Sequence, residues 1–242
     1  MQNASQTDLT VDEILDALKR DPLSAKQFSI SSASRIRNSV KAVWENYRST
    51  AKSFTFEDVK KWSLNVKVGS FVWNVEDFLA VASRVIELKK KYLPRDVQLV
   101  AVLAFLQQKT DRNRQMAQIS TGEGKTLITA LVAIYHVLKH WHTKERRIDI
   151  ITSSPVLAEA NVAEIQWLYK AFEVEVTNNC DAKCATSNEL KRERYNSDVI
   201  YGDLSNFMRD VLVTLYFDRD ITRNTTAAAG VIDEVDSMLL DK

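Results

Sequence analysis

The chain holds only five glycines among its 242 residues, and two of them fall in one hexapeptide, Thr121-Gly122-Glu123-Gly124-Lys125-Thr126. Glycine is needed where the backbone adopts conformations that other residues avoid, so a glycine-poor chain that gathers it here indicates unusual backbone. A partly apolar segment, Met116–Ser120, precedes the hexapeptide, and the apolar run 127–138 follows it. A strand, a glycine-containing turn and a helix in this order are the context that a phosphate-binding loop requires.

The residue types of the hexapeptide fit the chemistry of a bound nucleoside triphosphate. The helix that follows would point its positive N-terminus at the phosphates, and four residues would surround them with backbone N–H groups: Thr121, Gly122, Glu123 and Gly124. Lys125 would reach the terminal phosphates as a binding and catalytic group, and the Thr126 hydroxyl would bind Mg²⁺. The general pattern G-x-x-x-x-G-K-[ST] is incomplete, because Ile119 stands where its first glycine belongs. Helicase-like motors use a T-G-x-G-K-T form instead, and a chance G-K-T at a helix start is the alternative interpretation.

A second motif, Val231-Ile232-Asp233-Glu234-Val235-Asp236, supplies what the first one lacks. An apolar strand that ends in Asp-Glu is typical of the Walker B element of nucleotide-binding proteins. Asp233 would hold Mg²⁺ through water, and Glu234 would orient or deprotonate the attacking water as the second catalytic residue. An acidic turn after a buried strand is common by itself, but together the two motifs predict a site for ATP and Mg²⁺.

From Asp96 onward, short apolar runs alternate with helical patterns. The expected strands cover residues 115–120, 148–152, 174–177, 198–201 and 228–233, with helices between them. This alternation implies a parallel sheet with helices on both of its faces. We therefore predict an α/β fold, a RecA-like P-loop NTPase domain over residues 96–242.

Residues 1–95 have a different pattern, which predicts an N-terminal helical region. Thr10 with Glu13 forms the signature of a capping box, and Asn74 with Asp77 is expected to cap a longer helix that ends near Lys91. A further helix is expected over residues 31–49. The segment 62–73 alternates like a strand but is short, and the sequence leaves its structure undecided.

Charge and hydropathy indicate which partners and which cellular location the sequence fits. The formal net charge is +1 with no strongly basic stripe, so nucleic acid is not an expected partner. The longest apolar run, 127–138, is too short to span a membrane, and residues 1–6 have neither the basic nor the apolar region of a secretion signal. These features predict a cytoplasmic location.

Metal binding by cysteine or histidine is the weaker interpretation of two clusters. Cys180 and Cys184 form a lone C-x-x-x-C without a second ligand pair, so two free thiols are expected. His136 and His140 lie one turn apart near the end of the predicted loop-following helix, where histidine is favoured in any case. No H-E-x-x-H pattern accompanies them, and we expect no metal there.

The two nucleotide motifs, read in full, resemble those of the SecA family, the ATPase motors of preprotein translocation. The matching residues are T-G-E-G-K-T at 121–126 and D-E-V-D-S-M-L-L-D at 233–241, and ordinary DEAD-box helicases differ at both. Asp96-Val97-Gln98 resembles the family's D-V-Q element, which implies that Gln98 binds the adenine edge. Segments 152–159 and 198–202 also resemble the family. The resemblance covers about Asn74–Lys242 and leaves residues 1–73 unexplained.

The resemblance implies an ATP-binding domain of a translocation motor, with preproteins and a membrane translocon as partners and a peripheral location at the membrane. Ser120 departs from the arginine that the family often places before the loop. The sequence stops at Lys242, directly after the second motif, so we expect a second RecA-like lobe to come from a downstream chain or in trans. In such motors the second lobe supplies an arginine worth roughly 10³–10⁵ in rate, so weak hydrolysis by this chain alone is expected.

Two other classes of function stay open at this stage. A regulatory or interaction module would bind nucleotide as a conformational ligand without turnover. A helicase-like nucleic-acid remodeller is the third interpretation, against which the neutral charge and the D-E-V-D-S sequence argue. Whether the chain is an enzyme by itself is therefore undecided by the sequence.

Overall fold

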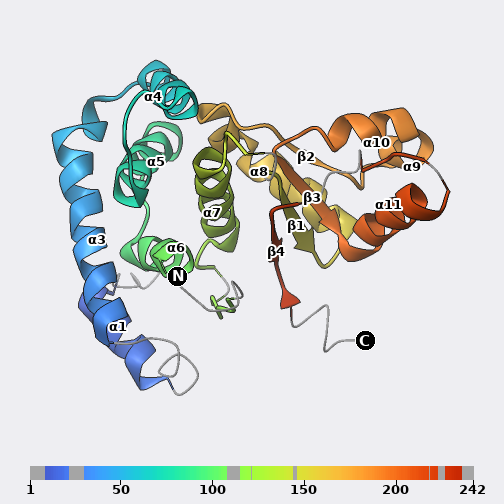
Figure 1. The fold of residues 1–242 in the computed structure, drawn as a ribbon. Helices are drawn as coiled ribbons and strands as arrows, with labels where there is room; N and C mark the ends of the chain where they lie inside the picture. Colours follow the sequence, from blue (N-terminus) through green and yellow to red (C-terminus); the bar gives the residue numbers. More distant parts are fainter. Residues whose placement is uncertain are drawn as a thin grey trace, which may run out of the picture. The chain divides into compact units, whose positions relative to one another are not determined.

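A computed structural model describes residues 9–21, 30–107, 115–120, 122–143, 146–217, 219–222 and 227–235. The chain forms two compact units, one from Met1–Val59 with Phe71–Val132 and the other from Lys60–Ser70 with Ala133–Lys242 (Figure 1). The predicted domain boundary between residues 95 and 96 stays a prediction.

The first unit is built from helices whose starts the sequence specifies. It contains α1 (Val11–Arg20), α3 (Ile30–Ser49), the 3₁₀ turn η1 (Ala51–Ser53), α5 (Val75–Lys90) and α6 (Asp96–Gln107). Thr10 and Asn74 both form the predicted capping boxes, in which the cap side chain and the third helical residue exchange hydrogen bonds with each other's backbone N–H. Helix α3 packs along α5 and α6, and α1 packs against α3 and α6.

Apolar side chains at helical spacing form the core of this first unit. The fully buried ones include Leu15, Ile36, Val43, Phe78, Leu79, Val85, Ile86, Leu99 and Leu103. Burial of each such side chain stabilises the fold by about 1.5–3 kcal/mol relative to exposure. Two partly buried hydrogen bonds fix the helices in register: Trp44 Nε1 donates to Asp96 Oδ1 at 2.9 Å, and the Tyr47 hydroxyl donates to Glu87 Oε2 at 2.6 Å.

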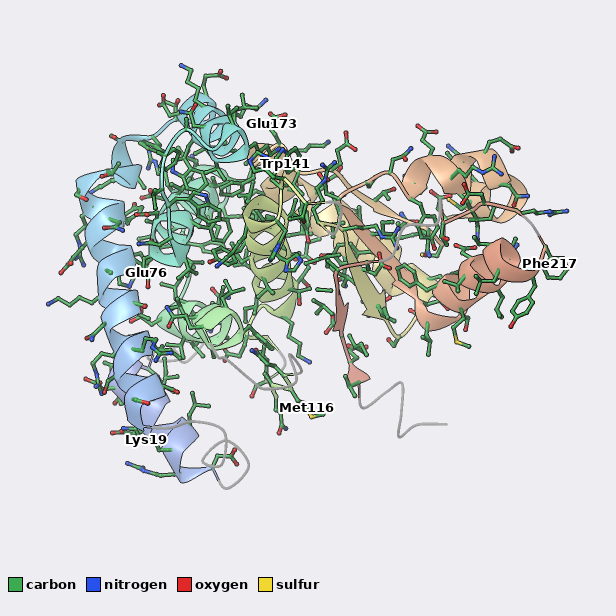
Figure 2. All side chains as sticks on the ribbon, viewed as in Figure 1. Lys19, Glu76, Met116, Trp141, Glu173 and Phe217 are labelled. Atoms are coloured by element: carbon green, nitrogen blue, oxygen red, sulfur yellow. The ribbon has the colours of Figure 1, made fainter. Side chains whose placement is uncertain are left out.

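Helix α4 (Phe56–Val68) resolves the segment that the sequence leaves undecided, because Trp62–Val68 is helical. Its second half belongs to the second unit, where Ser63 and Lys67 donate to the backbone carbonyls of Phe172 and Glu173. The Lys67 Nζ atom also lies 4.0 Å from the centroid of the Trp141 ring; Figure 2 labels Trp141 and Glu173. The alternation of large side chains therefore does not mark a strand: Leu64 and Val68 are exposed on the helix.

Helix α7 (Lys125–Lys139) carries the apolar run that follows the glycine-containing hexapeptide. Leu131, Ile134 and Val137 on this helix are fully or almost fully buried, as expected of a core helix. Within the described ranges, no helix combines the length and the apolar character needed to cross a bilayer.

The second unit contains the parallel sheet that the β-α-β alternation predicts. Its strands are β1 (Ile148–Thr152), β2 (Val176–Asn178), β3 (Val199–Asp203) and β4 (Ala229–Ile232), all parallel and in the order β2-β3-β1-β4. The connecting helices are α8 (Pro155–Ala171), α9 (Ala182–Thr186), α10 (Asn188–Arg194) and α11 (Leu204–Tyr216). The predicted α/β RecA-like fold class is confirmed.

Helices cover both faces of the central strand β3, all of whose residues are buried. Successive side chains of a strand point to opposite faces. Ile200 packs in a cluster with Phe207 of α11, whereas the Tyr201 hydroxyl lies 3.0 Å from that of Tyr169 on α8. Helices α8 and α11 therefore lie on opposite faces, as expected for strands that are buried on both sides.

The expected strand over residues 115–120 is wrong. These residues adopt no regular secondary structure, and Met116, labelled in Figure 2, is 77% exposed. A strand gains its stability from backbone pairing and from burial of alternate side chains. The segment Gln115–Ser120 offers few apolar side chains to bury, and in the described part of the chain none of its residues joins the sheet.

Candidate nucleotide-binding site

The predicted phosphate-binding loop has the backbone that its glycines are expected to allow. Gly122 and Gly124 have φ angles of +85° and +79°, in the left-handed region that favours glycine. The Glu123 N–H between them donates to the Ser120 carbonyl at 3.2 Å, which closes a tight turn. Thr121, the other predicted member of the loop, lies outside the described residues.

Helix α7 begins at Lys125, directly after the second glycine. The N–H groups of Leu127 and Ile128 donate to the Gly124 carbonyl at 3.0 and 3.2 Å, so the first helical hydrogen bonds close back onto the loop. The N–H groups of Lys125 and Thr126, the first two residues of the helix, have no carbonyl acceptor inside it. An anion at this end would meet both these donors and the positive end of the helix dipole.

Gln98, carried by α6, packs directly under this loop. Its side chain is buried: Oε1 accepts from the Arg95 N–H at 3.0 Å, and Nε2 donates to the Glu123 carbonyl at 2.9 Å. A methyl group at Gly124 would lie 2.5 Å from Gln98 Nε2, so the second glycine also makes room for this amide. A carboxamide has two N–H donors and two acceptor sites. Among the described residues one of each is used, which leaves one donor and one acceptor for a ligand edge.

Arg95 is a loop-binding residue that sequence reasoning missed. Its Nη2 atom donates to the Gly122 carbonyl at 3.2 Å and lies 2.8 Å from Oε2 of Glu123. The signal that could have found it is its place next to Asp96-Val97-Gln98, since a residue there faces the same loop as Gln98.

The second motif follows strand β4 in the other unit. The Asp233 N–H donates to the Ile151 carbonyl at 2.8 Å, which continues the pairing of β4 with β1 by one residue. Glu234 then turns the chain with a φ of +59°, an unusual value for a residue with a side chain. Its Oε2 accepts a hydrogen bond from the Ser153 hydroxyl at 2.8 Å. Ser153, the residue after β1, is the second position that sequence reasoning missed, although it lies in a segment with family resemblance.

These acidic groups lie at the carboxyl edge of the parallel sheet, where open α/β folds bind their ligands. Asp203, at the end of β3, is engaged as the N-cap of α11 and so has a structural role there. Burial is the main reason why the pKa of the Tyr201 phenol is raised, and the nearby Asp233 carboxylate raises it further. Asp233 and Glu234, the two carboxylates that directly follow β4, therefore lie at this edge of the sheet within the second unit.

The predicted site residues thus fall into two groups. Gln98 and the loop with Gly122, Glu123, Gly124, Lys125 and Thr126 belong to the first unit, and Asp233 and Glu234 belong to the second. Thr126 and Asp233 offer a hydroxyl and a carboxylate oxygen, the ligand chemistry that Mg²⁺ prefers. Within the described ranges no cluster of three His, Cys, Asp or Glu side chains could hold a metal by itself. Mg²⁺ at a nucleotide needs only one or two protein ligands, so each of these oxygens fits it by its chemistry.

Comparison with known proteins gives the same family that the two motifs resemble. A family model for the SecA DEAD-like domain matches residues 19–242. The chain is 29% identical to protein translocase subunit SecA 2 of Mycolicibacterium smegmatis, over 91% of this chain and 27% of that protein. It is 28% identical to protein translocase subunit SecA of Mycobacterium avium, over 81% of this chain and 24% of that protein. The chain spans about a quarter of the length of these relatives.

Proposed function

The chain belongs to the family of SecA DEAD-like domains, and from this premise we propose that it binds ATP and Mg²⁺ as the nucleotide-binding part of a protein translocation motor. The observation that carries the proposal is the loop before α7. Its two glycines have left-handed backbone, its carbonyls bond to Arg95 and Gln98, and a helix N-terminus follows at once. This is the arrangement in which backbone N–H groups bind phosphate.

Each residue has a distinct role in the proposed site. The loop from Thr121 to Gly124 and the first turn of α7 would bind the phosphates, with Lys125 on the terminal ones. The remaining donor and acceptor of Gln98 match an adenine edge, which presents one donor beside one acceptor. Thr126 and Asp233 would hold Mg²⁺, which neutralises charge on the phosphates when bound.

Glu234 is the proposed general base. The hydrogen bond from Ser153 and the left-handed turn fix its carboxylate beyond the end of β1 and β4. From there it would orient a water molecule for attack on the terminal phosphate and accept the proton. Lys125 would stabilise the charge that develops on the transferred group.

Turnover by this chain alone is proposed to be weak. The chain covers about a quarter of the relatives' length, so their activity as whole proteins is not that of this part alone. A second RecA-like lobe, from a longer chain or from a partner, would add the arginine that such reactions use. Preproteins and a membrane translocon are the partners we propose for the assembled motor, with the chain on the cytoplasmic side of the membrane.

A nucleotide-binding module without turnover is the second candidate. The observation that favours it is that Gln98, the loop and Lys125 all belong to the first unit, which therefore holds the proposed nucleotide-binding residues by itself. A nucleic-acid remodeller is disfavoured by the formal net charge of +1, since nucleic-acid binding depends on a basic surface.

A titration of fluorescent ATP and ADP with Mg²⁺ tests the proposal, with hydrolysis scored in the same tubes. Lys125→Ala is expected to abolish binding, whereas Glu234→Gln should retain binding and lose what turnover there is. Robust turnover that Glu234→Gln abolishes would show that the chain completes its own site. Binding that Lys125→Ala leaves unchanged would place the nucleotide elsewhere, and the proposed site would be wrong.

A further inference from the structure

The guanidinium of Arg95 holds two parts of the phosphate-binding loop at once. Its Nη2 atom both donates to the Gly122 carbonyl and pairs with the Glu123 carboxylate, at 3.2 and 2.8 Å. The contact with Gly122 is a hydrogen bond, whereas the contact with Glu123 is an ion pair only, because no donor among the described residues reaches the buried Oε2 atom in hydrogen-bond geometry. The side chains of Arg95 and Glu123 are 30% and 27% exposed, so solvent screens this ion pair less than a pair on the open surface.

These contacts determine which way the loop presents its N–H groups. In a planar trans peptide the N–H points opposite to the carbonyl oxygen. Arg95 holds the Gly122 carbonyl, and the Glu123 N–H on the other side of that peptide donates to the Ser120 carbonyl, which fixes the turn. Gln98 holds the Glu123 carbonyl. The Gly124 N–H therefore points away from Gln98, toward the side on which an anion would accept from it.

Arg95 also compensates the negative charge of Glu123, which would otherwise weaken the binding of phosphate. A carboxylate within a loop that binds polyphosphate would repel the ligand, because like charges a few ångströms apart disfavour each other. The Arg95 guanidinium, 2.8 Å from the Glu123 carboxylate, neutralises it in place.

Resting on the proposed binding of nucleotide, we propose that Arg95 is a positioning residue for the phosphate-binding loop. It fixes the Gly122 carbonyl and neutralises Glu123, so that the loop is already arranged for the phosphates of a nucleoside di- or triphosphate. It acts through the loop and touches no nucleotide. Arrangement of a site before binding increases affinity because less freedom is lost on association.

Arg84 provides a matched control for the test. It makes the same two kinds of contact within the same unit: Nε donates to the Phe54 carbonyl at 2.9 Å, and Nη1 pairs with Glu87 at 2.6 Å. Its side chain is 20% exposed, comparable with that of Arg95. Arg84→Ala therefore reproduces the structural cost of losing a half-buried arginine without a change at the loop.

The experiment measures the Kd of fluorescent ATP and the Ki of magnesium pyrophosphate for the full chain, Arg95→Ala and Arg84→Ala. Arg95→Ala is expected to weaken both by about tenfold, the equivalent of one charged hydrogen bond. Arg84→Ala should lower the melting temperature and leave both constants unchanged. Adding Glu123→Gln to Arg95→Ala should recover part of the affinity, because it removes the uncompensated charge.

Three results would overturn the inference. Binding by Arg95→Ala within twofold of the unmodified chain would show that the loop does not need this residue. An equal loss in Arg84→Ala would assign the effect to general stability. A change for ATP but not for pyrophosphate would place the effect at the base and not at the phosphates. If the unmodified chain bound neither ligand, the proposed function itself would fail, and this inference with it.

Discussion

Replacement of Gly124 by alanine tests the geometry of the loop at its most constrained point. Two separate features oppose a side chain there. The φ angle of +79° lies in the left-handed region, and a Cβ atom would lie 2.5 Å from Gln98 Nε2. Gln98 would have to move, although its carboxamide is buried and bonded to both Arg95 and Glu123.

The size of the effect follows from these contacts. Left-handed backbone costs an alanine about 1–2 kcal/mol. Displacement of Gln98 loses two hydrogen bonds of about 1 kcal/mol each. A total of about 3 kcal/mol corresponds to roughly 100-fold weaker binding of nucleotide. Gly122 is the matched comparison: its φ is +85°, but a methyl group there would have no neighbouring atom within 4 Å, so Gly122→Ala should weaken binding only about tenfold.

Equilibrium titration of labelled ATP against both variants separates the two contributions. Circular dichroism and melting temperature should stay close to those of the unmodified chain, because the loop contributes little to either core. Equal affinities for Gly122→Ala and Gly124→Ala would refute the claim that Gln98 packs under the second glycine. Unchanged affinity in both would refute the loop as the binding site.

Two further predictions concern the second unit. Asp210 on α11 is buried, pairs with the buried Lys191 on α10 and accepts a hydrogen bond from the Tyr195 hydroxyl at 3.0 Å. Because Lys191→Ala leaves that carboxylate buried without its cation, urea unfolding should show a loss of about 3–5 kcal/mol, and a loss below about 1 kcal/mol would contradict the buried pair. Burial, with the nearby His140 charge as a smaller cause, lowers the pKa of His136 to about 4. The unfolded pKa is about 6.5, so between that pH and the folded value the unfolded chain binds more protons than the folded one. The free energy of unfolding should therefore fall on acidification, by about 1–2 kcal/mol between about pH 7 and pH 5. His136→Leu should remove that part of the pH dependence in unfolding measurements, and an unchanged dependence would contradict it.

The sequence is informative where local chemistry decides the structure. Thr10 and Asn74 start their helices as predicted, because a capping box depends on residues within one turn. The glycines at 122 and 124 mark the left-handed backbone of the loop for the same reason. The order of strands and helices from residue 148 onward also predicts the parallel sheet, since each crossover helix covers the strands that it connects.

The sequence is a poorer guide where partners distant in the chain decide. Periodicity predicts a strand over residues 115–120, but pairing depends on neighbours that periodicity does not reveal. The same limit applies to helix α4, because its anchors, the carbonyls of Phe172 and Glu173, lie more than 100 residues away. Arg95 and Ser153 escape sequence reasoning for a similar reason: each acquires a role only through a side chain or carbonyl far along the chain.

Amide hydrogen exchange, read at the loop with and without ATP and Mg²⁺, tests the central claim most directly. The amides of residue 122 and of residues 124–126 should exchange more slowly when nucleotide is present, because they would donate to its phosphates. Lys125→Ala should show no such protection at the same nucleotide concentration. Protection confined to other segments, or none at saturating nucleotide, would contradict the assignment of this loop as the phosphate-binding site.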